Sequence, residues 1–139
     1  MLFVPTFFVV VQRFENWLKA RKKKAPEPAM APTKAPAETA DVYHSRGRKL
    51  LLDGKFSESI EQFTQALKLD PSLALAFNGR GFAHYRLKQY AEAIADFNEA
   101  IRLNPKYANA YLNRSAARRA SGDKAGADAD QAKLRELAK

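Results

Sequence analysis

The sequence repeats itself with a period of 34 residues, and this repeat limits the possible folds more than any other feature. When residues 74–107 are shifted back by one period, residues of unlike types coincide: Phe77 with Tyr43, Arg80 with Arg46, Gly81 with Gly47, Phe97 with Phe63, Ala100 with Ala66 and Pro105 with Pro71. A forward shift matches less well, because Gly81 meets Ser115 and Phe97 meets Gln131. The chain therefore contains two well-matched units and a third that has diverged.

Each unit has the residue spacing of two amphipathic helices. In the second unit Phe77, Gly81 and His84 fall at i, i+4 and i+7, and the same spacing recurs between residues 93 and 100 after a break. Small residues let paired helices approach closely, aromatic residues fill the seam, and a proline ends the unit. We therefore predict helices near residues 41–52, 57–69, 74–87, 91–103, 108–121 and 124–138, with Ser57 at the start of the second.

This order of aromatic, small and proline positions resembles the tetratricopeptide repeat, and the resemblance covers residues 40–139. It implies an all-α fold in which three helix-turn-helix units, at residues 40–73, 74–107 and 108–139, stack as a short right-handed solenoid. In the third unit Lys124 and Gln131 replace aromatic residues. We interpret this degenerate unit as a polar cap, and a truncated array or a dimer seam is the alternative.

Charge is unevenly divided between the two helices of each unit. Basic residues concentrate in the first helices, at Arg46, Arg48, Lys49, Arg80, Arg86, Arg114, Arg118 and Arg119. Acidic residues concentrate in the second helices of the first two units, at Glu58, Glu61, Glu92, Asp96 and Glu99. Because the first helices line the concave groove in tetratricopeptide arrays, the resemblance implies a basic groove and a more acidic back.

By repeat position, the groove should present His44, Arg48, Leu51, Asn78, Phe82, Tyr85, Arg86, Asn109, Asn113 and Arg119. Arginine forks and asparagine amides can hold carboxylates or an extended backbone, and the aromatic rings offer apolar anchor surface. The expected partner is an acidic or C-terminal peptide segment with an apolar residue. The alternative is that these side chains are solvated helix faces.

The groove departs from relatives that clamp the acidic C-terminal tails of chaperones. Those relatives use Lys and Asn in the first unit, Asn in the second, and Lys and Arg in the third. The matching positions here hold His44, Arg48, Gly79, Asn109 and Asn113. We therefore do not predict chaperone-tail binding in that mode.

A further set, Arg46, Arg80 and Arg114, recurs at one repeat position and is interpreted as bridging neighbouring units.

The sequence offers no catalytic constellation. It has no cysteine and two histidines, of which His84 is expected to pack within a unit. Gly54-Lys55 lacks the upstream glycine of a phosphate loop. We therefore expect a protein that is not an enzyme and has no cofactor, metal or small-molecule substrate. The formal net charge of +9 favours acidic partners, and nucleic acid binding by the basic helices is the alternative function.

The first 24 residues differ from the repeats. An apolar stripe and a basic flank are formed by Phe7, Val10, Val11, Phe14, Trp17 and Leu18 and by Lys22, Lys23 and Lys24. The apolar run is shorter than the roughly 20 residues that span a bilayer, and the basic residues that follow it favour the cytoplasmic side. We expect an amphipathic helix over residues 1–24 at the cytoplasmic face of the inner membrane. A helix docked on the repeats or a disordered segment is the alternative.

Residues 3–14 resemble the cytoplasmic end of the last transmembrane helix of efflux transporters of the resistance-nodulation-division class. That resemblance implies the remnant or end of a membrane helix, without the rest of the transporter fold. Residues 25–39 are rich in alanine and proline and predict an extended, semi-rigid linker.

Overall fold

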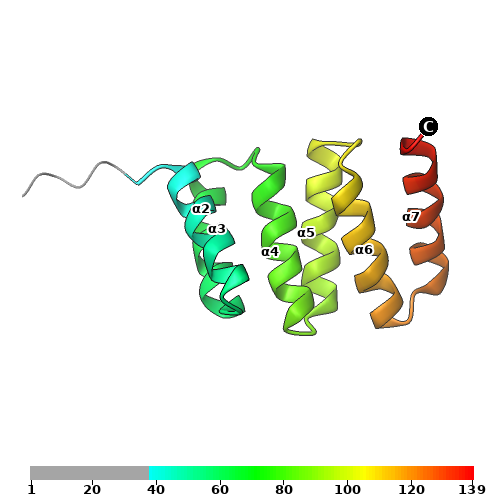
Figure 1. The fold of residues 1–139 in the computed structure, drawn as a ribbon, viewed down its shortest axis with the longest axis horizontal. Coiled ribbons are helices and arrows are strands. Elements are labelled where there is room, and N and C mark those ends of the chain that lie inside the picture. Colours follow the sequence, from blue (N-terminus) through cyan, green and yellow to red (C-terminus); the bar gives the residue numbers. More distant parts are fainter. Residues whose placement is uncertain (1–37) are drawn as a thin grey trace, which may run out of the picture. The chain divides into compact units, whose positions relative to one another are not determined.

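The computed structural model describes residues 38–139, which form six α-helices. They are α2 (Ala40–Leu52), α3 (Phe56–Leu69), α4 (Ala74–Arg86), α5 (Tyr90–Leu103), α6 (Ala108–Ser121) and α7 (Lys124–Leu137). Consecutive helices run in opposite directions, and the three hairpins stack side by side (Figure 1). This confirms the predicted all-α solenoid. The expected N-terminal helix and most of the linker lie outside the described residues.

The helices begin and end within about one residue of the positions that the repeat predicts. At the start of α3, Lys55 occupies the N-cap position and no side chain caps the helix. The assignment of Ser57 as the helix start was therefore wrong. Instead, each hairpin turn has a residue with positive φ at the same repeat position: Gly54 at 75°, Lys88 at 61° and Gly122 at 93°. Turn geometry thus sets where each second helix begins.

Two buried phenylalanines fill the seams between the helices. Phe63 packs with Ala66, Leu67 and Ala76, and Phe97 packs with Ala93 and Ala117. A β-carbon at Gly81 would lie 2.8 Å from Phe97 Cε1, closer than side chains tolerate. The small residues of the first helices are therefore needed for these rings to fit, as the repeat pattern predicts.

Two of the three recurring arginines bridge neighbouring units. Arg80 binds both carboxylate oxygens of Asp96, at 2.9 and 2.7 Å, and donates to Thr64 Oγ1 of the preceding unit at 3.2 Å. One period later, Arg114 binds Asp130 in the same way, at 3.1 and 2.6 Å, and donates to Asn98 at 2.7 Å. These contacts confirm the bridging interpretation for both residues.

The first unit lacks this bridge. Arg46 forms an exposed ion pair with Glu38 at 2.6 Å, and the position of the buried aspartate is occupied by Gln62. Gln62 Oε1 is buried without a hydrogen-bond partner. Within residues 38–139, the buried arginine–aspartate pair and its hydrogen bond to the preceding unit are therefore confined to the second and third units.

In the first and third units, a buried serine hydroxyl links the two helices. The serine belongs to the second helix in the first unit and to the first helix in the third unit. Ser59 on α3 donates its hydroxyl to the carbonyl of Gly47 on α2, at 2.8 Å. In the third unit Ser115 on α6 donates to the carbonyl of Ala127 on α7, at 3.0 Å. Ser115 also accepts from Gln131 Nε2 at 3.1 Å, where the other units have a phenylalanine. The third unit thus replaces an apolar seam with hydrogen bonds, and its capping role remains a prediction.

Among residues 38–139, no helix combines the length and the apolar character that crossing a bilayer requires.

Candidate functional site

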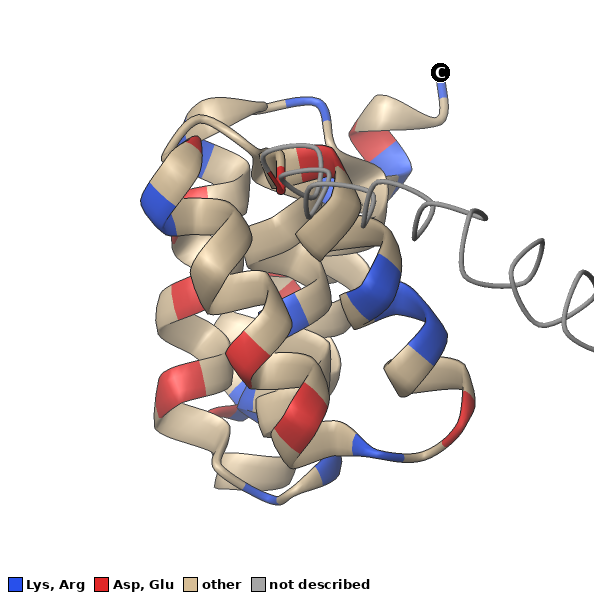
Figure 2. Ribbon diagram, turned by 90° about the vertical axis from the view of Figure 1, so that its left-hand side faces the viewer, with Lys and Arg blue, Asp and Glu red and all other residues tan. Residues whose placement is uncertain are grey.

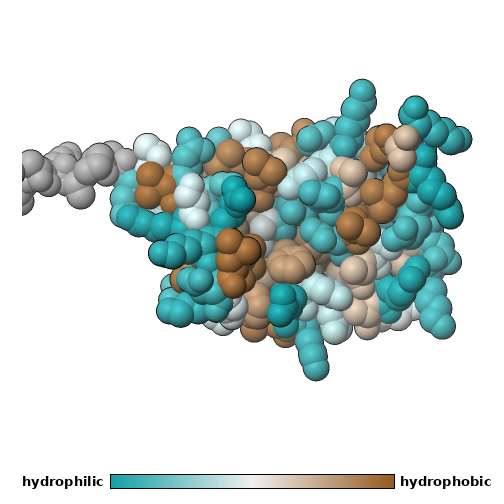
Figure 3. Space-filling view, viewed as in Figure 1, coloured by the Kyte–Doolittle hydropathy of each residue, from teal (hydrophilic) through white to brown (hydrophobic). Residues whose placement is uncertain are grey.

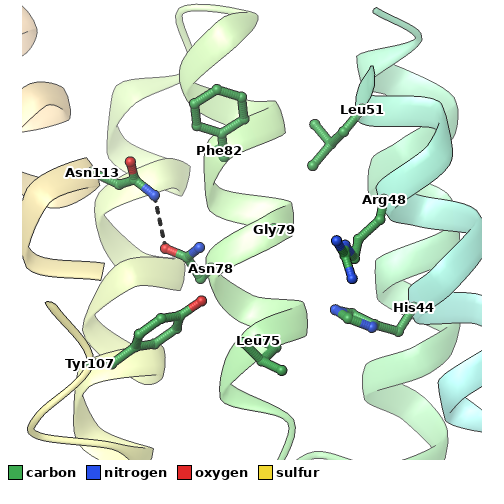
Figure 4. A pocket seen from close by; sticks show the side chains of 9 residues that line it. All are labelled: His44, Arg48, Leu51, Leu75, Asn78, Gly79, Phe82, Tyr107 and Asn113. Carbon is green, nitrogen blue, oxygen red and sulfur yellow. Dashed lines mark hydrogen bonds between the residues drawn. The ribbon is translucent and has the colours of Figure 1, made fainter. Parts of the chain in front are cut away.

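The first helices of the three units line a hollow of about 380 Å³, here called the central hollow. Its lining residues are His44, Arg48, Leu51, Leu75, Asn78, Gly79, Phe82, Tyr107 and Asn113 (Figure 4). Six of the ten predicted groove residues meet here: His44, Arg48, Leu51, Asn78, Phe82 and Asn113. They come from α2, α4 and α6, so stacking of the units brings together side chains that are far apart in the sequence.

The two walls of the central hollow differ in chemistry. His44 and Arg48 project from α2 on one side, and Asn78, Tyr107 and Asn113 lie on the other (Figure 4). Asn113 Nδ2 donates to Asn78 Oδ1 at 3.0 Å. This bond uses one donor and one acceptor, so the amide pair keeps further donors and acceptors for a ligand. One wall is cationic and the other is a neutral polar surface.

Burial shifts the pKa values of two titratable groups in this hollow, His44 and Tyr107, toward their neutral forms. Burial, and then the charge of Arg48, lower the pKa of His44 below its ordinary value, although Asp41 opposes this shift. Burial raises the pKa of Tyr107, against the opposing effects of Asn78 and Arg48. Of the nine lining residues, Arg48 is thus the one that carries a full charge at neutral pH.

A second hollow continues from the central one and is here called the apolar hollow. It is lined by Leu51, Leu52 and Phe82, with Arg48 and Arg86 at its sides. The guanidinium of Arg86 lies 4.6 Å from the ring centroid of Phe56 and 5.8 Å from that of Phe82. Cation–π contacts of this kind position the charge without neutralising it. The apolar hollow can therefore accept an apolar side chain between two cations.

A third hollow, here called the far hollow, lies between α4, α6 and α7. It is lined by Tyr85, Leu112, Ser115, Ala116, Arg119, Ala120 and Gln131. The rings of Tyr85 and Phe82 are 6.3 Å apart, so an aromatic ridge connects this hollow with the other two. Together the three hollows form a groove along the first helices. The face in Figure 3 accordingly shows apolar side chains (brown) between hydrophilic ones (teal) rather than one continuous patch.

Sequence reasoning placed most of these residues but missed some. Asn109 is exposed and lines none of the three hollows. Leu75 and Tyr107 line the central hollow without having been predicted. Leu75 could have been found, because it shares a helical face with Asn78 and Phe82 at i, i+3 and i+7. Tyr107 precedes α6, and helical spacing gives no signal for it.

Two family profiles match this chain, the Tetratricopeptide repeat at residues 74–107 and the TPR repeat at residues 40–88. The first tetratricopeptide domain of Spaghetti (RPAP3), solved with the HSP90 peptide SRMEEVD, is 34% identical with a TM-score of 0.70, covering 73% of this chain and 81% of that one. The chain belongs to the tetratricopeptide repeat family. The second such domain of human RPAP3, solved with the HSP70 peptide SGPTIEEVD, is 30% identical with a TM-score of 0.68, covering 70% and 82%. No curated protein matches the chain.

The tetratricopeptide array has fewer free cations in its groove than its arginine content predicts. Arg80 and Arg114 are held by buried aspartates, and Arg118 binds Asp130 at 3.0 Å and Asp123 at 3.6 Å. Counting the arginines of the first helices therefore overstates the charge of the groove. The arginines that line the three hollows are Arg48, Arg86 and Arg119, of which Arg119 forms an exposed ion pair with Asp128 at 3.4 Å. Acidic residues (red) lie mainly on the left of the array in the view of Figure 2.

The described residues of this tetratricopeptide array hold no group of three metal-ligating side chains. His84 is partly buried, with Nδ1 2.7 Å from Gln89 Oε1 and Nε2 3.9 Å from Asp96 Oδ2. These contacts confirm the predicted packing role, because both ring nitrogens face side chains of the same unit.

Proposed function

We propose that this array is a non-catalytic scaffold that binds an acidic peptide segment of another protein in the groove formed by α2, α4 and α6. The observation that carries the proposal is the position of Arg48 across the central hollow from the Asn78–Asn113 amide pair. The solved relatives with acidic peptides support a partner of this class.

Each part of the groove has a separate role in this proposal. The Arg48 guanidinium pairs with a carboxylate, and charge-assisted bonds of this kind contribute roughly 1.5–3 kcal/mol. The amides of Asn78 and Asn113 bind the peptide backbone, which offers both N–H and C=O groups. Leu51, Leu52 and Phe82 receive a neighbouring apolar side chain. Affinity therefore depends on an acidic and an apolar residue held close together.

The test is fluorescence anisotropy with labelled SRMEEVD and the double variant Arg48→Glu with Arg86→Glu. The expected result is a loss of affinity of more than about tenfold with an unchanged circular dichroism spectrum, because both cations line the apolar hollow. The matched control is Lys68→Glu with Arg102→Glu, which makes the same charge change on exposed positions of α3 and α5. Equal affinity for the groove variant and the control would remove the groove assignment.

We also propose that residues 1–24 tether the array to the cytoplasmic face of a membrane. The support is the sequence alone: an apolar stripe followed by a run of lysines. Sedimentation with vesicles of phosphatidylglycerol and phosphatidylcholine should pellet the full chain, and removal of residues 1–24 should leave it in the supernatant. A full chain that stays in the supernatant would contradict tethering.

Nucleic acid binding loses support, because Arg80, Arg114 and Arg118 are paired with aspartates within the array. Binding to a single-stranded oligonucleotide that falls steeply between 50 and 200 mM salt, by about 10³-fold or more, would restore this alternative.

A further inference from the structure

We infer that the groove recognises an acidic residue inside a passing chain rather than the carboxylate at a chain terminus. This inference rests on the proposed function and specifies its ligand: an extended internal segment with an acidic side chain beside an apolar one. The distribution of charge, the neutral amide wall and the length of the groove each point to this ligand.

The first argument is the number of cations in the central hollow. A C-terminal acidic residue brings two carboxylates on one residue, and their repulsion must be offset by cations from more than one direction. Arg48 is the one full charge among the residues that line this hollow, since the pKa of His44 is lowered. One cation matches one side-chain carboxylate.

The second argument is the chemistry of the opposite wall. Asn78, Asn113 and Tyr107 are neutral, and they offer both donors and acceptors. A carboxylate can only accept hydrogen bonds, whereas a peptide unit both donates and accepts. This wall therefore fits the backbone of a chain that continues through the hollow. The cations that α6 could have supplied here, Arg114 and Arg118, are bound to Asp130 instead.

The third argument is that the groove continues past the central hollow toward the C-terminal ends of the first helices. The apolar hollow extends it along α2 and α4 as far as Leu52 and Arg86. The far hollow extends it along α6 as far as Arg119, beside Gln131 of α7. A segment bound in the central hollow therefore meets further lining residues beyond it, so the ligand is not required to end there.

The test compares four labelled peptides by fluorescence anisotropy: SRMEEVD as the free acid, the same peptide with a C-terminal amide, the same peptide extended by Gly-Ser-Gly-Ser, and SRMQQVD. The amidated and extended peptides should bind within about twofold of the free acid. The glutamine peptide should bind at least about tenfold more weakly. A tenfold loss on amidation or extension, with SRMQQVD retaining affinity, would overturn the inference while leaving peptide binding intact.

A gain-of-function variant further separates recognition of an internal acidic residue from recognition of a terminal carboxylate. Asn113→Lys places a second cation on the amide wall, and should make the protein prefer the free acid to the amide by about tenfold. The wild type should show no such preference, and an unchanged ratio in the variant would contradict the roles assigned to the walls. If none of the four peptides binds the folded wild type, the proposed function itself is wrong.

Discussion

The ring of Phe63 on α3 occupies the space that a side chain at Gly79 on α4 would need. A β-carbon at Gly79 would lie 2.5 Å from Phe63 Cζ, and one at Gly47 would lie 2.9 Å from Phe63 Cε1. Phe63 is fully buried, so the ring has no free space to move into. Because Gly79 lines the central hollow, a core residue of one helix decides what its neighbour can present to a ligand.

Replacement of Gly79 by alanine should therefore destabilise the array, although glycine to alanine usually stabilises a helix interior. Overpacking of a buried ring costs about 1–3 kcal/mol, which outweighs the gain in helix propensity. Urea unfolding followed by circular dichroism measures the change. The control repeats Gly79→Ala in a Phe63→Leu background, where the ring is absent. There, Gly79→Ala should lower the unfolding free energy by less than it does in the wild type. A more stable single variant would show that the ring can shift.

Removal of the Arg114 side chain should cost up to about 3–5 kcal/mol of unfolding free energy, because it removes the main partner of the buried Asp130 carboxylate. Arg118, 3.0 Å from Asp130, remains and limits the loss. The side chain of Asp130 is only 3% exposed and that of Arg114 is 14% exposed. The matched control is Arg46→Ala at the same repeat position, where the ion pair with Glu38 is exposed and no loss is expected. Comparable losses for the two variants would contradict the structural role of the buried pair.

Lys88→Gly should stabilise the array by up to about 1 kcal/mol. Lys88 has a φ of 61°, and the equivalent residues of the other two turns are glycines. The left-handed conformation costs a residue with a β-carbon about 1–2 kcal/mol, and the greater freedom of glycine in the unfolded chain cancels part of the gain. The reverse change, Gly122→Lys, should lower the midpoint of thermal unfolding. We therefore expect Lys88→Gly to raise the midpoint of thermal unfolding and Gly122→Lys to lower it.

The stability of the free array should fall as the pH is lowered through 6.5. The pKa of His44 is lowered from 6.5, first by burial and then by Arg48, so the unfolded chain binds a proton at a higher pH than the folded one. Stability is therefore lost from about 6.5 down to the folded pKa. The pKa values of Glu38 and Asp70 are also lowered, but they change the stability only below about pH 4.5 and 3.8, the ordinary pKa values of these groups. The midpoint of urea unfolding between pH 7.5 and 5.5 measures the effect.

His44→Asn provides the control for this pH dependence, because asparagine does not titrate. The slope of stability against pH should become smaller over the same range. The groups that face His44 are the ring of Phe63, 5.7 Å away, and the charges of Arg48 and Asp41. An unchanged slope in the variant would assign the titration to another group.

The sequence by itself determined the helices and their order. The spacing of small, aromatic and proline residues is local information, and it predicts hairpins whose helices begin and end within about one residue of those observed. The burial of Phe63 and Phe97 also follows from their repeat position, since a residue that recurs at one point of every unit meets the same neighbours.

Only the tertiary structure decided which charges are free. Arg80 and Arg86 both belong to α4, but Arg80 lies against the buried Asp96 of α5 whereas Arg86 lies over aromatic rings at the apolar hollow. Helical spacing shows which residues share a face, but not which side chain of another helix lies opposite. The same is true of Tyr107 at the groove and of Phe63 beneath Gly79. Partners of this kind depend on the packing distance between helices, which the repeat does not encode.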